Sequence, residues 1–307
     1  MTSSLWKGAE IPTWLGPPFS FLGLRSPEAD FESARAVIVP APYDGTTTFR
    51  SGTREGPRAI LAASRELEFY DEETETEAWR QGIATLDELA VNVASPLEMV
   101  NHVRQAGEYV LAAGKLPVLL GGEHLLSLGM IEALAARYGD FTILHLDAHA
   151  DLRASYQGSP YSNACVMHQA LRHASLVQVG IRATTREEQQ LVRERGIPSF
   201  MAHRLWQEPS LWAQIVPVLG SKVYISIDLD VFDPAVMPAV GTPEPGGLGW
   251  YDLLRLLRAV CRERHVLGFD VMELLPHSNH VAADILAARL VYKLLTYIFL
   301  DNPQGCC

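Results

Sequence analysis

The chain has 307 residues, of which 48% are hydrophobic and 20% are charged, and its 25 basic and 36 acidic side chains give a formal net charge of −11. This composition is ordinary for a globular protein and allows one or two domains with a large core. The acidic balance argues against non-specific nucleic-acid binding, which requires a basic surface, and is compatible with a small cationic ligand.

The N-terminus shows no basic segment followed by an apolar stretch, so we expect no export signal. The four cysteines have no zinc-type spacing, and a reducing cytoplasm is the expected compartment. The longest apolar segment, residues 282–300, contains Asp284, Arg289 and Lys293. Charges spaced in this way predict a packed helix rather than a membrane span. We therefore expect a cytoplasmic protein with no membrane partner and no nucleic-acid partner.

Residues 1–30 are rich in proline, glycine and aromatic residues and predict an irregular N-terminal arm, and residues 31–307 are expected to form a single domain. Beyond the arm, short β-branched segments alternate with longer segments of helical periodicity. The predicted strands are 36–40, 116–120, 141–146, 176–181, 222–227 and 266–271. The predicted helices are 57–70, 97–113, 125–138, 163–174, 186–196, 250–263 and 282–300. The alternation predicts an α/β fold with three layers, α/β/α, around a central parallel sheet. The acidic stretch 71–77 is expected to be a solvated loop or helix end.

Metal-binding side chains recur at every second position after two of the predicted strands. Asp147, His149 and Asp151 follow one strand, and Asp228 and Asp230 follow another. Alternate residues of an extended backbone point the same way, so each group can converge on one point. In a parallel α/β fold both groups lie at the carboxyl ends of strands, where ligand sites form. A role of these acids in helix caps and turns explains one such motif equally well, but it does not explain the two motifs together.

His124 ends a Gly-Gly-Glu-His segment after a third strand and is a sixth candidate ligand. The four aspartates supply four negative charges, which two divalent cations balance when both histidines are neutral. Carboxylate and imidazole donors without thiolates suit Mn²⁺, and Fe²⁺, Ni²⁺, Co²⁺ or Zn²⁺ can also occupy such a site. A close metal pair converts bound water to hydroxide near neutral pH. The sequence therefore predicts two Mn²⁺ ions per chain, with other divalent ions as alternatives.

Three segments carry a resemblance to the ureohydrolase family of arginases and agmatinases. They are GGEH at 121–124, LDAHAD at 146–151 and SIDLDVFD at 226–233, and the segments 52–60 and 268–274 resemble further parts of the family. The resemblance implies an arginase-like fold, two manganese ions that share Asp147 and Asp228, and a bridging hydroxide that attacks the guanidinium carbon of the substrate. The full implied set of metal ligands is His124, Asp147, His149, Asp151, Asp228 and Asp230.

The resemblance also implies roles in substrate binding and catalysis. Glu273 matches the carboxylate that anchors the guanidinium, and a planar cation with paired N–H groups fits a carboxylate through two hydrogen bonds. Asp151, Asn163 and Glu273 are the predicted catalytic residues, and Asn163 and Glu273 are the predicted substrate contacts. Glu187 and Glu188 are weaker candidates for contact with a distal ammonium.

The segment 161–165 resembles agmatinases, and the chain lacks the Ser/Asn pattern of arginases. The predicted substrate is therefore agmatine, and the predicted products are urea and putrescine. Aminopropylagmatine and guanidinobutyrate are alternatives. An acetylpolyamine deacetylase of related fold, which uses one zinc and fewer acids, and a non-catalytic metal-binding relic are alternatives from other classes. The family usually forms trimers or hexamers, so a homo-oligomer is implied.

Asn163 departs from the family pattern, which often has a histidine here as a proton shuttle. Asparagine cannot titrate, and the loss of an essential general acid costs about 10²–10⁴ in rate. Three interpretations of Asn163 are open. It holds substrate or water while another group carries the proton, or the substrate is an unusual guanidino compound. In the third, the protein is impaired or altered at this position. His277 and His280 are candidate replacement shuttles. His145 shares a strand face with Asp147 and is expected to support the site or fill the core, not to bind metal.

Overall fold

The computed structural model describes residues 15–301, so residues 1–14 of the predicted N-terminal arm and residues 302–307 lie outside the described part. Eight parallel strands form one sheet in the order β2-β1-β3-β8-β7-β4-β5-β6. The strands are β1 (Ala36–Ala41), β2 (Ile83–Thr85), β3 (Leu116–Gly121), β4 (Thr142–Leu146), β5 (Ser175–Val179), β6 (Ser199–Phe200), β7 (Lys222–Asp228) and β8 (His265–Met272). The predicted central parallel sheet is confirmed.

Helices follow most of the strands and connect them. The helices are α1 (Gly56–Ser64), α2 (Pro96–Ala112), α3 (Ser127–Tyr138), α4 (Val166–Ala170), α5 (Arg186–Arg195), α6 (Ala202–Gln207), α7 (Trp212–Ile215), α8 (Trp250–Glu263) and α9 (Val281–Asp301). None of these described helices is both long enough and apolar enough to cross a membrane.

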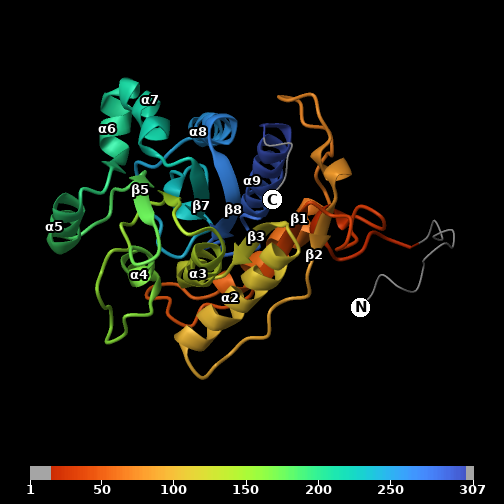
Figure 1. Ribbon diagram of the computed structural model, residues 1–307, viewed down its shortest axis with the longest axis horizontal. Coiled ribbons are helices and arrows are strands. Elements are labelled where there is room, and N and C mark those ends of the chain that lie inside the picture. The colour runs from red at the N-terminus through yellow and green to blue at the C-terminus, as the bar shows by residue number, and fades with distance from the viewer. Residues whose placement is uncertain (1–14, 302–307) are drawn as a thin grey trace.

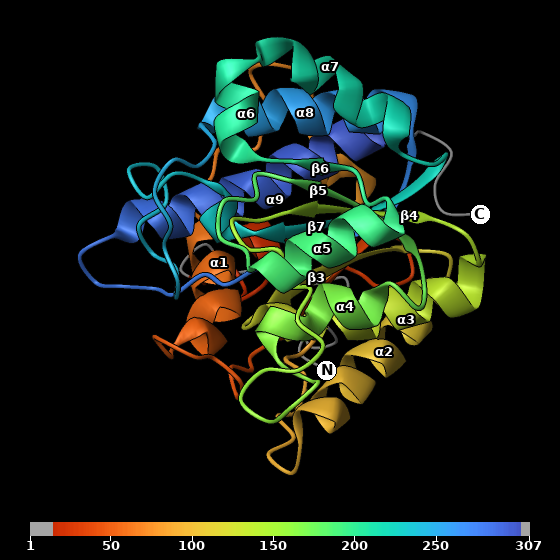
Figure 2. The ribbon, with the colours of Figure 1, turned by 90° about the vertical axis from the view of Figure 1, so that its left-hand side faces the viewer.

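The helices cover both faces of the sheet, as predicted (Figure 1). Figure 2 shows α8 and α9 above the sheet and α2 and α3 below it. Strand side chains alternate between two apolar cores, so that Ile38 lies in one core while Val37 and Val39 lie in the other. Every residue of β1 is buried. This burial on both faces explains why its sequence, AVIVPA, is apolar without alternation.

The ends of two helices differ from their predicted positions. The helix expected at 57–70 ends at Ser64, after which the N–H groups of residues 65–67 bond to carbonyls three residues earlier, as in a turn. The carbonyls of Glu68 and Phe69 then accept hydrogen bonds from Arg289 and Tyr292 of α9. The helix expected at 163–174 is a 3-10 turn, η6 (Asn163–Cys165), followed by the short α4. The edge strands β2 and β6 have only three and two residues and were not predicted. They are too short to show a periodicity.

The described part of the N-terminal arm is irregular apart from a 3-10 turn, η2 (Phe21–Gly23). This arm is not simply exposed, because the Phe21 side chain is fully buried in the core that also contains Ile60 of α1. The Leu22 N–H donates to the Ser64 hydroxyl at 2.8 Å. Within the described segment before β1, Phe21, Leu22 and Leu24 are therefore packed against the rest of the fold.

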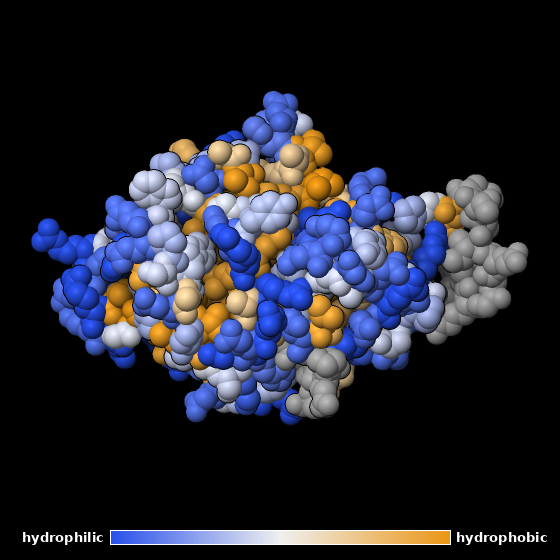
Figure 3. Space-filling model, turned by 90° about the horizontal axis from the view of Figure 1, so that it is seen from above, coloured by the Kyte–Doolittle hydropathy of each residue, from blue (hydrophilic) through white to orange (hydrophobic). Residues whose placement is uncertain are grey.

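On the face shown in Figure 3, apolar patches lie among polar side chains. A groove of about 930 Å³ lies between α6, α7 and α8 and is lined by Trp206 and Trp212. Trp206 is 82% exposed. An exposed apolar groove is compatible with association between chains. The size of the homo-oligomer stays a prediction.

The acidic stretch 71–77 is a loop, but the expectation that it is solvated is wrong for its first residue. Asp71 is fully buried and lies 2.9 Å from the ammonium of Lys293, which is buried in α9. Glu72 and Glu73 lie 3.2 and 3.3 Å from the same ammonium. The charge on α9 is therefore matched by a segment more than two hundred residues earlier in the chain, which helical periodicity alone could not show.

We predict that Lys293→Met lowers the free energy of unfolding by about 3 kcal/mol, because it leaves the Asp71 carboxylate buried without its partner. Burial alone would raise the pKa of Asp71, but bonds from Lys293 and Thr74 hold it below its usual range. The stabilisation is therefore present near neutral pH and is lost as the pH falls below about 4. Urea unfolding at pH 7 and pH 3 measures both effects.

Arg204→Met is the matched control, since Arg204 and Glu208 form an ion pair on the surface of α6 with both side chains at least half exposed. Such a pair contributes less than about 1 kcal/mol. Equal losses for the two variants at pH 7 would contradict the assignment of a buried pair.

Candidate functional site

The six predicted metal-binding residues and Glu273 meet at the carboxyl edge of the sheet, at the ends of its four central strands. His124 begins a 3-10 turn, η5 (His124–Leu126), just after β3, and Glu273 follows β8 directly. Asp228 is the last residue of β7, and Asp147 follows β4 directly. Since β3, β8, β7 and β4 are consecutive neighbours in the sheet, the strand order itself brings these segments together.

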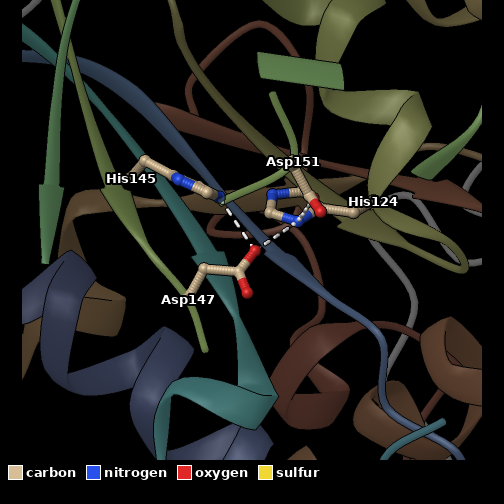
Figure 4. Close-up of side chains that lie close together, drawn as sticks. All are labelled: His124, His145, Asp147 and Asp151. Atoms are coloured by element: carbon tan, nitrogen blue, oxygen red, sulfur yellow. Dashed lines mark hydrogen bonds and ion pairs between the residues drawn. The ribbon is translucent and has the colours of Figure 1, made fainter. Parts of the chain in front are cut away.

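His124 lies at the centre of one group of carboxylates. Its Nδ1 atom is 3.0 Å from Asp147 Oδ2, 3.3 Å from Asp151 Oδ2 and 3.3 Å from Asp228 Oδ2. The imidazole is buried, and no hydrogen bond of good geometry satisfies this nitrogen among the described residues. Figure 4 shows His124 and Asp151 facing the Asp147 carboxylate. A buried nitrogen directed at three carboxylates is the arrangement expected of a metal ligand.

A second group lies beside the first and shares Asp147 with it. His149 Nδ1 lies 2.9 Å from Asp230 Oδ2 and 3.5 Å from Asp147 Oδ1. The two oxygens of Asp147 thus face different histidines, Oδ2 towards His124 and Oδ1 towards His149. The two strand-end motifs are also bonded to each other, because the Ala148 N–H donates to Asp230 at 3.0 Å. The predicted convergence of the six side chains is present as geometry.

The cluster concentrates negative charge in a buried place. Burial and neighbouring carboxylates raise the pKa values of Asp151, Asp228 and Asp230. Burial opposes a charge on the histidines, but the surrounding carboxylates raise the pKa of His124 well above its usual value and that of His149 to about 12. Protonated histidines therefore supply positive charge to this cluster. A divalent cation that displaces these protons supplies the positive charge instead.

A hydrogen-bonded chain behind His124 fixes the orientation of its ring. His124 Nε2 lies 2.9 Å from the Ser226 hydroxyl, which lies 3.0 Å from Asp270 Oδ1. Asp270 also accepts the Tyr224 hydroxyl at 2.6 Å. The Ser226 hydroxyl can accept from His124 and donate to Asp270, which leaves Nδ1 facing the carboxylates. Ser226 and Asp270 lie in two of the family-like segments, but no role was predicted for either.

Glu273 has an unusual backbone conformation, with φ at +65°. Its Oε1 atom accepts the His124 N–H at 2.7 Å, and its other oxygen has no hydrogen-bond donor among residues 15–301. Burial raises the pKa of Glu273 to about 8. Asp151 is also left-handed, with φ at +53°. Residues other than glycine are uncommon in this region, and backbone strain of this kind is concentrated at functional sites.

Asn163 lies at the start of η6 and lines the same cavity as Glu273. Its Oδ1 atom accepts the Ala164 N–H at 2.9 Å and the Ser162 hydroxyl at 3.0 Å. Because a backbone N–H can only donate, the oxygen of the amide is identified. The Nδ2 group has no acceptor among the described residues and is available as a donor. The Asn163 N–H donates to Thr46 at 3.2 Å.

The cavity has a volume of about 300 Å³ and opens beside His149, whose side chain is 27% exposed. Arg153, Thr185 and Glu244 line it without having been predicted as site residues. Arg153 follows Asp151 by two residues, a spacing that could have indicated it. The loop residues Thr185 and Glu244 have no comparable sequence signal.

Arg182 holds one wall of this cavity. Its guanidinium donates to six backbone carbonyls, among them those of Asp230 at 2.6 Å and Glu244 at 2.8 Å. The loop that carries Asp230 and the cavity wall that carries Glu244 are therefore fixed to the same side chain.

Four predicted candidates do not have the suggested environment. His277 and His280 are exposed and are not among the residues that line the cavity. Glu187 is exposed, and the Glu188 carboxylate accepts the N–H groups of Leu152 and Thr185. Glu188 therefore stabilises the loop and the start of α5 rather than offering a free carboxylate.

Comparison with known proteins agrees with the motifs. The family model for the arginase family matches residues 34–296. The chain is 42% identical over 277 residues to the N(1)-aminopropylagmatine ureohydrolase of Thermus thermophilus, covering 87% of this chain and 92% of that protein. It is 33% identical to the agmatinase of Pyrococcus horikoshii, covering 89% and 95% of the two chains.

The crystal structure of agmatine ureohydrolase of Thermoplasma volcanium superposes with a TM-score of 0.81 at 29% identity, covering 90% of this chain and 95% of that chain. The residues that the family model matches, 34–296, include all eight strands and the segments that carry the cluster, and the predicted arginase-like fold is confirmed. The chain belongs to the arginase family and is one of its ureohydrolases.

Proposed function

We propose that this ureohydrolase cleaves the guanidino group of a small alkylguanidine with a cationic tail, with two Mn²⁺ ions per chain. The observation that carries the proposal is the Asp147 carboxylate, whose two oxygens face His124 and His149 at the edge of a cavity that also contains Glu273. Water adds to the guanidinium carbon, the bond from that carbon to the alkyl nitrogen breaks, and urea and an amine leave. With agmatine the amine is putrescine.

The donor set fits a metal pair. His124, Asp151 and Asp228 would complete one ion and His149 and Asp230 the other, with Asp147 and Asp228 shared. The unsatisfied Nδ1 atom of His124 and the concentration of buried carboxylates support this assignment. Carboxylates with imidazoles and no thiolate favour Mn²⁺. When bound, the metal pair would supply a hydroxide from water near neutral pH.

Glu273 anchors the substrate in this proposal. One of its oxygens is held by the His124 N–H, so the carboxylate cannot rotate freely and its second oxygen is directed to a guanidinium N–H group. Glu273 is buried, and a charge-assisted bond to a buried carboxylate is stronger than one in solvent. The anchor and His124 are joined by a backbone bond, so substrate position and metal position are coupled.

Asp151 is proposed to move the proton that the leaving amine needs. Its carboxylate lines the cavity together with Glu273 and Asn163, so it is placed to take a proton from the attacking water and to give it to the leaving nitrogen. The Oδ1 atom of Asn163 already accepts two hydrogen bonds, so its Nδ2 group is the one available, and we assign this donor a hydrogen bond to substrate or water. This is the interpretation in which position 163 holds a group in place and another residue carries the proton.

Two substrates that differ in their tails are candidates. Agmatine is the substrate predicted from the sequence. N(1)-aminopropylagmatine is favoured by the higher identity to ureohydrolases of that name, 42% against 33% for an agmatinase. Both end in an ammonium, and the Glu244 carboxylate on the cavity wall has no hydrogen-bond donor among residues 15–301. Glu244 is a suitable acceptor for either tail.

Urea release from a panel of agmatine, N(1)-aminopropylagmatine, guanidinobutyrate and arginine tests the function. We expect the two amines to be hydrolysed with the highest kcat/KM, because an ammonium matches the acidic cavity wall and a carboxylate does not. If no guanidino compound released urea, the result would contradict the proposed hydrolysis and favour a non-catalytic metal-binding protein. Release of acetate from acetylated polyamines instead would indicate a deacetylase.

Glu273→Gln should lower kcat/KM for every hydrolysed guanidine by about 100-fold, or about 3 kcal/mol, because it removes the charge opposite the guanidinium. Glutamine can still accept the His124 N–H, so the fold and the metal content should be kept. Glu194→Gln, an exposed change on α5, is the matched control. Unchanged kinetics for Glu273→Gln would remove the anchor role.

Metal content distinguishes Asp147, which is assigned to both ions, from Asp230, which is assigned to one. After loading with Mn²⁺ and dialysis, we expect two ions per parent chain, one for Asp230→Asn and fewer than one for Asp147→Asn, because Asp147 faces both histidines. Elemental analysis by mass spectrometry gives the counts. One ion per parent chain, or equal losses in the two variants, would sink the two-metal assignment.

For Asn163→His we expect kcat to change less than about tenfold, because the proposed proton path does not pass through position 163. Steady-state kinetics from pH 6 to pH 10 measure the change. A gain of about 10²–10⁴ would show instead that the natural chain lacks its proton shuttle.

A further inference from the structure

We infer that Gln178 and His145 form a positioning relay for Asp147, in which His145 donates its Nε2–H to the carboxylate and is not itself a metal ligand. The inference rests on the metal pair of the proposed function. Both residues are fully buried and are direct register partners on the neighbouring strands β4 and β5. Neither has a part in the proposed reaction.

The first step fixes the amide of Gln178. Its Nε2 atom lies 2.8 Å from the Ala150 carbonyl oxygen. A carbonyl oxygen only accepts, so the atom that faces it must be the NH₂ group. A flipped amide would place two oxygens at this distance without a proton between them. The orientation of Gln178 is therefore determined by the backbone.

The second step fixes the ring of His145. The same NH₂ group lies 3.0 Å from His145 Nδ1. An amide nitrogen only donates, so Nδ1 must carry a lone pair, and the ring proton is on Nε2. His145 Nε2 lies 2.8 Å from Asp147 Oδ2, so its N–H donates to that oxygen. The relay thus runs from Gln178 through His145 to the carboxylate.

The relay decides between two roles for His145. The ring lies close to His124, Asp147 and Asp151 and could be counted as a ligand from proximity alone (Figure 4). A nitrogen that carries a proton has no lone pair for a metal ion, and Nδ1 is occupied by Gln178. His145 instead fixes the rotation of the Asp147 carboxylate, the feature that lets its two oxygens face different histidines.

The relay is half of a polar row that crosses the sheet. His145 is the register partner of Ser226 on β7, and Ser226 is the register partner of Asp270 on β8. Gln178 and His145 orient Asp147, while Ser226 and Asp270 orient His124. One buried polar side chain from each of four neighbouring strands therefore supports the shared ligand and its neighbour.

Mn²⁺ affinity, measured by isothermal titration calorimetry without substrate, tests the relay. Gln178→Met and His145→Met remove the donors at similar size, and each should weaken binding about 10–100-fold. His145→Gln keeps an N–H donor near the position of Nε2 and should weaken binding less than about tenfold. Gln169→Met, a change at another buried glutamine that donates to a backbone carbonyl, should leave the affinity unchanged.

If His145 were a ligand, His145→Gln would lose metal as completely as His145→Met, and that outcome overturns the inference. So does equal affinity for Gln178→Met and Gln169→Met. Nitrogen-15 NMR of the histidine rings in the unsubstituted protein is independent of how the variants fold, and a proton on Nδ1 of His145 would also overturn it. Because these measurements contain no substrate, they stand or fall separately from the panel of guanidino compounds.

Discussion

Four aspartates are buried side by side at one edge of the sheet, and the rest of the structure must compensate for them. Asp147, Asp151, Asp228 and Asp230 are each at most 8% exposed. Two like charges about 4 Å apart repel by about 4 kcal/mol at an effective dielectric constant of about 20. Such an edge is stable only with positive charge between the carboxylates. Two imidazoles directed at them supply it as protons, and divalent cations supply it more completely.

The sheet supports this charged edge with a row of polar side chains on strands whose other residues are mostly apolar. Most inward positions on β4 and β7 are filled by residues such as Ile143 and Ile225. The polar row on one face interrupts this pattern and is fully hydrogen-bonded apart from one amide oxygen of Gln178. A buried network of this kind specifies a single arrangement of its members, because each lost bond leaves an uncompensated polar group. Strand register thus fixes the orientation of Asp147 and His124, while Arg182 fixes the loop that carries Asp230.

The parts of the site that follow a strand period were predictable from the sequence. Alternation placed Asp147 and Asp151 on one side, and the same argument placed His145 beside them. The role of Gln178 depends on the pairing of β5 with β4, which no local pattern contains. Glu244 and Thr185 depend on the course of loops, and the pairing of Asp71 with Lys293 depends on how α9 packs. Local periodicity predicted the elements and the motifs, while tertiary pairing decided which other polar residues reach them.

The left-handed backbone at Asp151 and Glu273 has a consequence for how this chain can change. Glycine at either position would relieve backbone strain that costs of order 1–3 kcal/mol. The same change would delete a carboxylate from the cavity. At position 273 it would also leave the buried His124 N–H without its acceptor, so the strained backbone and this hydrogen bond belong to one arrangement. A chain with glycine at position 273 would keep this fold without the carboxylate that the proposed function places opposite the guanidinium.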